Sequence, residues 1–289
     1  MILFLPLLVF SQDKKENIVE WNTEFLFESN NLNSQFLNKL IYGGYISNNE
    51  KNEWIQSGTD NNIFYLELTN GFSFKNNNLR IKIKDRNLVN SSFNDDFMGL
   101  ILYGNNKYED QNIYFTNTNI RADRFQQIGI DYTYNFNNIK INCGLSYLHG
   151  NQHASLIIRD GFLYTAAFGS YLDIMYDINT YFTNTDDIGI FRNNGNGSAI
   201  DINIEIIKQK KTINFYIQDL GFIKWKDNST TINIDSNFAF YGVEIENILE
   251  FQDSIFEEYN SANYIQDKNM GFKSYIPANI GFSVNHPIN

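Results

Sequence analysis

The sequence predicts an all-β protein, and more narrowly an antiparallel transmembrane β-barrel. Three observations predict it: long strands with one apolar and one polar face, turns built from asparagine, and an apolar N-terminal segment typical of secreted proteins. Strands of soluble proteins usually run about five or six residues, whereas a tilted membrane-spanning strand needs about 9 to 11. Because the clearest strands here are about ten residues long, their length favours a membrane.

The clearest element is a hairpin over residues 128–147. Every second residue is apolar on both arms, and Asn137-Asn138 supplies a two-residue turn. Such a turn pairs its flanking residues, so the register is fixed. The predicted pairs are Phe136 with Ile139, Tyr134 with Ile141, Tyr132 with Cys143, Ile130 with Leu145, and Ile128 with Tyr147.

The same two-faced pattern recurs along most of the chain. It predicts further strands over residues 19–29, 62–74, 79–90, 111–120, 154–167, 170–183, 198–207, 212–219, 231–241 and 271–285. About ten to twelve strands are more than a single sandwich needs, and no linker rich in proline or charge divides them. Short helices are expected over residues 33–42, ended by Gly43-Gly44, over 93–104, and over 244–260. The segment 33–54 is a candidate plug inside the barrel, and 244–260 a helix across its mouth or in a loop.

Both ends of the chain bear on the domain assignment. Residues 1–11 are expected to be a signal peptide for Sec-dependent export, although the segment lacks the Lys or Arg that normally starts one. Residues 12–289 are then a single outer-membrane β-barrel domain. Bacterial barrels usually finish on a strand with a terminal aromatic residue, whereas this sequence stops at His286-Pro287-Ile288-Asn289. We therefore expect an incomplete barrel whose C-terminal part is missing.

Composition narrows the classes of function. The net charge of −11 argues against nucleic acid, because phosphates demand a basic surface. No apolar run reaches about 18 residues, so insertion into a bilayer would use strands, which must close into a barrel to pair their backbone groups. The single cysteine, Cys143, lies on the apolar face of the hairpin and is interpreted as a small hydrophobic residue.

No motif predicts catalysis, a cofactor or a metal site. His149 and His153 are the candidate metal pair, but they lie in a glycine-containing segment without neighbouring cysteines, and a solvated loop is favoured. A Ser-His-Asp hydrolase, as in membrane phospholipases, would combine one of these histidines with Ser146 or Ser155; no nucleophile-elbow spacing supports it. The oxygen-rich segments 186–187 and 193–201 are interpreted as turns rather than calcium sites.

Polar faces of the strands supply the candidate functional residues. If the apolar faces contact lipid, the opposite faces line a lumen, which would favour cations or hydrate a plugged interior. The candidate lumen-facing residues are Asp131, Thr133, Asn135, Asp173, Asp177, Asp201 and Glu205.

Three segments resemble a known family. Residues 219–225 (DLGFIKW), followed by Asp227-Asn228-Ser229, are similar to the signature of an uncharacterised family of Bacteroidetes outer-membrane barrels, a domain of unknown function. The segments 144–150 (GLSYLHG) and 275–280 (YIPANI) resemble other elements of that family. The resemblance implies a barrel similar in style to long-chain fatty-acid transporters and to secretion-associated barrels, it implies no catalytic residues, and it implies further sequence beyond Asn289.

Together these patterns predict a non-enzymatic protein of the Gram-negative outer membrane that transports small or hydrophobic molecules or supports the envelope, its cargo unknown. Its expected partners are outer-membrane lipid and either a small hydrophobic ligand or an envelope secretion complex. Two alternatives stay open: a scaffold barrel that docks a secretion or surface-attachment complex, and a secreted soluble β-sandwich adhesin.

Overall fold

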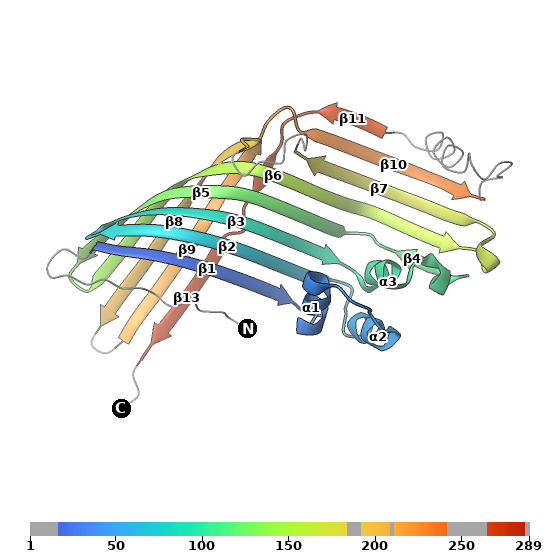
Figure 1. Cartoon of the computed structure of the whole chain (residues 1–289), viewed down its shortest axis with the longest axis horizontal. Coiled ribbons are helices and arrows are strands. Elements are labelled where there is room, and N and C mark those ends of the chain that lie inside the picture. Colours follow the sequence, from blue (N-terminus) through green and yellow to red (C-terminus); the bar gives the residue numbers. More distant parts are fainter. Residues whose placement is uncertain (1–16, 184–191, 209–210, 242–264, 287–289) are drawn as a thin grey trace.

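The computed structural model describes residues 17–183, 192–208, 211–241 and 265–286. Within these residues the fold is all-β, as predicted, with strands joined into one 13-stranded antiparallel sheet and a few short helices (Figure 1). The predicted signal peptide over 1–11 and the predicted helix over 244–260 lie outside the described residues. No helix of the described ranges is long and apolar enough to cross a membrane.

Nine of the described strands have 11 or more residues and are longer than most strands of soluble proteins, whereas the other four are short. They are β1 (Asn17–Ser29), β2 (Asn62–Asn76), β3 (Leu79–Phe93), β4 (Asn112–Tyr114), β5 (Thr118–Phe136), β6 (Ile139–Thr165), β7 (Leu172–Phe182), β8 (Gly195–Lys208), β9 (Lys211–Trp225), β10 (Thr230–Phe240), β11 (Ile265–Asn269), β12 (Lys273–Tyr275) and β13 (Asn279–Asn285). The helices are α1 (Ser34–Tyr42), α2 (Asn48–Gln56), α3 (Asp95–Tyr103) and the 3-10 turns η1 (Asn105–Tyr108) and η2 (Ala167–Gly169).

The sheet branches at β6. Strands β1, β2, β3, β5 and β6 are neighbours in that order. Beyond β6, its first half pairs with β8, which leads to β9, β12 and β13, whereas its second half pairs with β7, which leads to β10 and β11. In Figure 1 the β8, β9 and β13 branch runs at an angle across β1 to β3. The sheet is therefore folded over, and one of its faces is enclosed.

The predicted register of the central hairpin is confirmed. Strands β5 and β6 pair Phe136 with Ile139 and Ile128 with Tyr147, and the three pairs between them also match. The turn residue Asn137 has φ 51°, the left-handed conformation that asparagine tolerates better than most residues.

Several strand boundaries differ from the prediction. The strand expected over 111–120 is divided between β4 and the start of β5, and the strand expected over 271–285 is divided into β12 and β13. Residues 154–167 were expected to form a separate strand, but residues 154–165 continue β6, because register shifts at Arg124/Phe125 and at Ile158/Asp160 let one long strand bend. Similarly, β9 continues past 219 to Trp225 through a bulge at which Asp219 adopts φ 58°. The alternation of apolar and polar residues breaks at a bulge. A prediction from periodicity therefore ends the strand at that point, although the strand continues.

Both described helix predictions are confirmed, and their caps explain their limits. The side chain of Asn33 accepts hydrogen bonds from the amides of Gln35 (3.0 Å) and Phe36 (3.1 Å), and α1 ends at Gly43 with φ 72°. Helix α3 is capped in the same way by Asn94 and Gly104. The helices lie at the strand ends (Figure 1), where Trp54 packs with Leu32, Phe93 and Met98. The candidate plug over 33–54 therefore lies in a connection at the strand ends.

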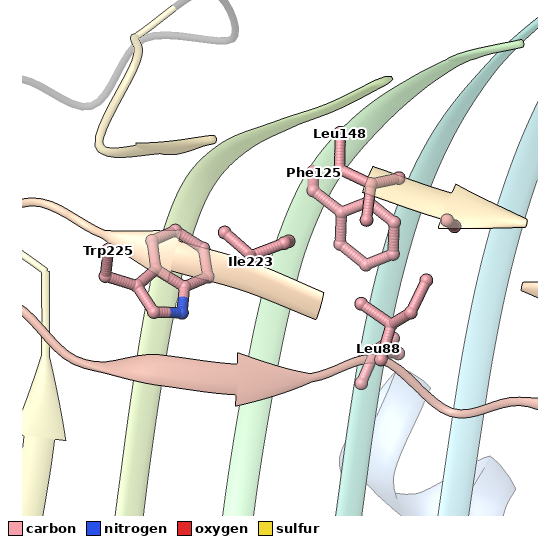
Figure 2. Close-up of a cluster of buried hydrophobic side chains, with 7 residues drawn as sticks. Leu88, Phe125, Leu148, Ile223 and Trp225 are labelled. Carbon is pink, nitrogen blue, oxygen red and sulfur yellow. The ribbon is translucent and has the colours of Figure 1, made fainter. Parts of the chain in front are cut away.

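The enclosed face contains an apolar cluster between the β9 branch and the β3–β5–β6 layer. Phe125, Leu148 and Leu88 come from β5, β6 and β3, and Ile223 and Trp225 reach them from β9 (Figure 2). All five side chains are buried. This cluster holds the branch of β9 against the β3–β5–β6 layer, since burial of a large apolar side chain contributes about 1.5 to 3 kcal/mol.

The sheet is not closed into a barrel. Among the described residues β1 pairs only with β2, and β13 only with β9, so each has one free edge.

Candidate functional site

Exposed apolar side chains form continuous rows across the outer face of the sheet. Cross-strand partners point to the same face. One row crosses seven strands, β1, β2, β3, β5, β6, β8 and β9, and every member is an exposed apolar residue: Val19, Phe74, Ile81, Ile130, Leu145, Ile200 and Leu220. A second row lies two residues further along these strands and consists of Trp21, Phe72, Ile83, Ile128 and Tyr147. We call these two rows the apolar belt.

The side chains of the apolar belt are largely exposed to solvent. Leu145 is 64% exposed and Ile130 is 55% exposed. Single exposed apolar residues are ordinary in soluble proteins, whereas contiguous patches mark a contact with another protein or with a membrane. The belt is therefore the candidate contact surface of the molecule.

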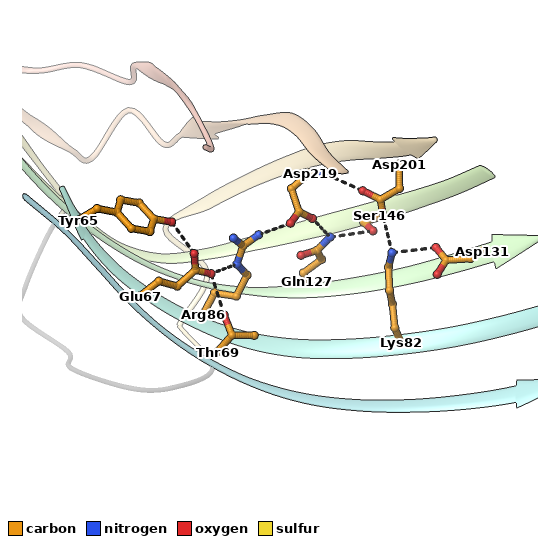
Figure 3. A network of polar contacts seen from close by, with 10 residues as sticks. All are labelled: Tyr65, Glu67, Thr69, Lys82, Arg86, Gln127, Asp131, Ser146, Asp201 and Asp219. Atoms are coloured by element: carbon orange, nitrogen blue, oxygen red, sulfur yellow. Dashed lines mark hydrogen bonds and ion pairs between the residues drawn. The ribbon is translucent and has the colours of Figure 1, made fainter. Parts of the chain in front are cut away.

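Charged side chains occupy the enclosed face instead. Arg86 is 5% exposed and Asp131 is 6% exposed. Such residues are almost never fully buried unless they are paired, because an unpaired buried charge costs several kcal/mol. The enclosed face therefore needs a network of partners. Figure 3 shows this network, whose residues come from β2, β3, β5, β6, β8 and β9.

Arg86 of β3 is the centre of one half of this network. Its Nε lies 2.7 Å from Glu67 Oε1 of β2, and its Nη1 lies 2.9 Å from Asp219 Oδ2 of β9. Glu67 also accepts hydrogen bonds from the hydroxyls of Tyr65 and Thr69. One guanidinium thus joins strands from the two layers of the folded sheet.

Lys82 of β3 is the centre of the other half. Its Nζ lies 2.8 Å from Asp131 Oδ1 of β5 and also contacts Asp201 Oδ2 of β8. Asp201 in turn accepts a hydrogen bond from the backbone amide of Asp219 at 2.6 Å. Gln127 completes the connection by donating to Asp219 Oδ1 at 2.8 Å and to Ser146 Oγ at 3.1 Å. We call the ten residues of the two halves the charged network: Tyr65, Glu67, Thr69, Lys82, Arg86, Gln127, Asp131, Ser146, Asp201 and Asp219.

Glycines leave the space that the charged network fills. A Cβ on Gly144 would lie 2.3 Å from Asp131 Oδ1, and one on Gly129 would lie 2.6 Å from Lys82 Cε. Both distances are shorter than any real contact of a Cβ atom. The two glycines therefore permit the long Lys82 side chain to reach its carboxylates.

The structure brings only two of the seven predicted lumen residues together. Asp131 and Asp201 share Lys82. Thr133 is half-buried and accepts a hydrogen bond from Asn142, and Asn135 is exposed beside the turn. Glu205 is half-buried on β8, and Asp173 and Asp177 lie apart from the network on β7, where Asp177 pairs with Arg159 at 3.5 Å.

Sequence reasoning missed the basic half of the network. Lys82 and Arg86 belong to the polar face of β3, directly beside strands whose polar faces are acidic. That complementarity between neighbouring strands is the signal that would have identified them. Asp219 could not be found from alternation, because the bulge moves it onto the enclosed face.

The region of the two histidines also differs from the prediction. Residues 148–153 were expected to form a solvated loop, but they continue β6, and His153 is buried. Its Nδ1 lies 2.7 Å from Asp123 Oδ1, and its Nε2 lies 3.0 Å from Ser155 Oγ. Gly150 allows this because Trp225 packs where its Cβ would be. Within the described ranges no group of three or more His, Cys, Asp or Glu residues is arranged to hold a metal ion.

Comparison with known proteins gives a family without an assigned role. Searches of curated proteins and of solved structures return no match. One family model matches residues 7–289, nearly the whole chain, and it describes a family of unknown function. This agrees with the resemblance to an uncharacterised family. The chain therefore belongs to the family of unknown function DUF5723.

Proposed function

We propose that this chain forms the wall of a β-barrel in the outer membrane of a Gram-negative cell. The observation that carries the proposal is the reversal of the two faces: the outer face is apolar and exposed, and the enclosed face is charged and buried. That reversal is typical of outer-membrane barrels, whose strands alternate apolar residues toward lipid with polar residues toward the interior.

The same reversal argues against a soluble sandwich. A sandwich would cover the apolar belt with a second sheet. Here the second layer, formed by β8 and β9, lies against the opposite face, where Asp219 meets Arg86. The belt has no covering element among the described residues, and lipid is the covering that its chemistry fits.

A membrane-inserted sheet must have no unpaired edge strand. In hydrocarbon no water satisfies backbone amides and carbonyls, so the free edges of β1 and β13 must be paired in the membrane. We therefore propose a closed barrel for the membrane-inserted protein.

The interior favours a gated carrier or an envelope-structural protein over an open porin. The charged network bridges the two layers through Arg86 and Asp219, and the apolar cluster around Trp225 fills the space beside it. Cargo, which we propose to be small or hydrophobic, would have to displace these contacts. Asp131 and Asp201 would then line its path, with the remaining predicted lumen residues nearer its ends.

A scaffold role has its own support. Apolar side chains are exposed beyond the strand ends, including Tyr42 at 82%, Tyr45 at 81% and Ile101 at 61%. Such residues at a rim suit the docking of a secretion or surface-attachment complex.

Fractionation and flux separate these possibilities. We expect the full-length protein to sediment with outer membranes and to need detergent for release; recovery in the soluble fraction contradicts the membrane proposal. In reconstituted vesicles a carrier gives saturable uptake of small hydrophobic solutes. No flux, together with co-purification of an envelope complex that is lost on Tyr42→Ser and Tyr45→Ser substitution, favours the scaffold.

A further inference from the structure

We propose that Ser155, His153 and Asp123 form a site that hydrolyses carboxylic esters. This activity goes beyond the wall function and does not depend on it. The proposal rests on the order and geometry of three side chains that the charged network does not use.

The three groups form one hydrogen-bonded chain. Asp123 Oδ1 lies 2.7 Å from His153 Nδ1, and His153 Nε2 lies 3.0 Å from Ser155 Oγ. The ladder explains the arrangement: Asp123 is the direct cross-strand partner of His153, and Ser155 follows two residues later on the same face of β6. The nucleophile therefore contacts the base, and the base contacts the orienting carboxylate, which is the spatial order that an activated serine needs.

Burial separates the roles of the three groups. The side chain of Asp123 is fully buried and that of His153 is 3% exposed, whereas Ser155 is only half-buried. The ring of His153 is held between Phe272, 4.9 Å away between ring centres, and Trp225, at 5.3 Å. The imidazole is thus fixed by two aromatic rings, and Ser155 is the most exposed of the three groups. The rings beside the imidazole suit an apolar acyl group.

Arg121 supplies a fourth feature. It is the cross-strand partner of Ser155, and its Nε binds Asp123 while its Nη1 donates to the Tyr275 carbonyl at 2.7 Å. Its Nη2 is buried with no hydrogen-bond partner in the described part of the chain. Because Arg121 lies opposite Ser155 in the ladder, we assign this N–H as the donor to an oxyanion formed at Ser155.

The reaction balances with water as the second substrate. Ser155 Oγ bonds to the ester carbonyl carbon as its proton passes to His153 Nε2, and Arg121 stabilises the resulting oxyanion. The bond to the alkoxy oxygen then breaks, and His153 returns the proton to the departing alcohol. Water attacks the acyl-serine, gives its proton to His153, and releases the carboxylic acid while Ser155 regains its hydrogen.

A fluorophosphonate probe tests the nucleophile directly. We expect purified protein in detergent to be labelled covalently at Ser155, located by mass spectrometry, and the labelling to vanish in Ser155→Ala. Ser198→Ala, at an exposed serine within β8, is the matched control and keeps wild-type labelling. Folded wild-type protein that is not labelled, or is labelled equally in Ser155→Ala, overturns the proposal.

Ester turnover tests the positioning role of Asp123. With p-nitrophenyl esters of increasing chain length, Asp123→Asn should lower kcat by a factor of about 100 to 10,000 while KM stays close to that of the wild type. A proportional loss of folded protein, with unchanged kcat per folded molecule, assigns Asp123 to structure alone and contradicts the proposal. Membrane insertion is measured separately, so its failure would not mimic either result.

Discussion

At the scale of single residues, the enclosed face depends on a few cations shared between carboxylates. Arg86 neutralises Glu67 and Asp219, and Lys82 neutralises Asp131 and Asp201. Each cation therefore faces two negative charges with only one positive charge. Hydrogen bonds from Thr69 to Glu67 and from Gln127 to Asp219 further stabilise the carboxylates. Removing a cation leaves two buried carboxylates facing each other without a counter-charge.

Substitution of Arg86 measures that dependence. Arg86→Ala should destabilise the folded protein by about 3 to 5 kcal/mol, because it breaks a buried pair rather than replacing it. Arg159→Ala is the matched control, since Arg159 is 62% exposed in its pair with Asp177, and it should cost about 0 to 1 kcal/mol. Denaturant unfolding in detergent micelles compares the two. Similar losses for both variants would mean that Arg86 is not a buried ionic centre.

Residue identity alone predicted part of this site. Asp131 and Asp201 were found from alternation because each lies in an unbroken stretch of a strand. Asp219 and His153 were not placed, because both follow bulges that reverse the alternation. Where a strand bulges depends on the pairing of distant residues, which local periodicity does not contain.

At the scale of elements, the same contrast holds. The β5–β6 hairpin was predicted to the residue because a two-residue turn fixes the register and both arms alternate without interruption. The helices α1 and α3 were predicted from apolar spacing and a terminal glycine. The branching of the sheet at β6 could not be predicted, since it requires one strand to exchange its partner from β8 to β7 partway along its length.

The capping of α2 gives a prediction of pH dependence. Hydrogen bonds from the Ser47 amide (2.6 Å) and hydroxyl (2.8 Å) hold the pKa of Glu50 below its ordinary value of 4.5. Because the folded pKa is lowered, this contribution to stability is present above the ordinary pKa and is lost as pH falls through the lowered one. The protection factors of the α2 amides, which are hydrogen-exchange rates corrected for the intrinsic effect of pH, should fall on acidification in the wild type.

Two variants in the same helix serve as test and control. Glu50→Gln should remove the acid-dependent part of this change, whereas Glu53→Gln should retain it. If the wild type and Glu50→Gln respond identically to acid, the capping box does not control the stability of α2.

At the scale of the whole molecule, the proposed barrel requires that the apolar belt, and not the enclosed face, meets the bilayer. Leu145 lies in the middle of the apolar belt, in a row that runs from Val19 on β1 to Leu220 on β9. A side chain so exposed tolerates arginine in water but not in hydrocarbon, so the two environments predict opposite results.

Leu145→Arg should therefore hinder assembly into the membrane. The expected cost is about 2 to 4 kcal/mol if the residue lies near the bilayer midplane. Asn138→Arg, in the exposed turn between β5 and β6, is the control and should assemble normally. Heat-modifiable migration in gels reports the assembled fraction. Equal assembly of both variants would mean that the belt does not contact lipid.

The most direct measurement uses the single cysteine of the chain. Cys143 is exposed on β6 and is paired with Tyr132 on the neighbouring strand, within the apolar surface. A small fluorophore attached to Cys143 before refolding into vesicles should be quenched by nitroxide-labelled lipid and protected from iodide in the aqueous phase. Strong quenching by iodide with none from the labelled lipid would contradict the proposal that this face of the sheet is embedded in a membrane.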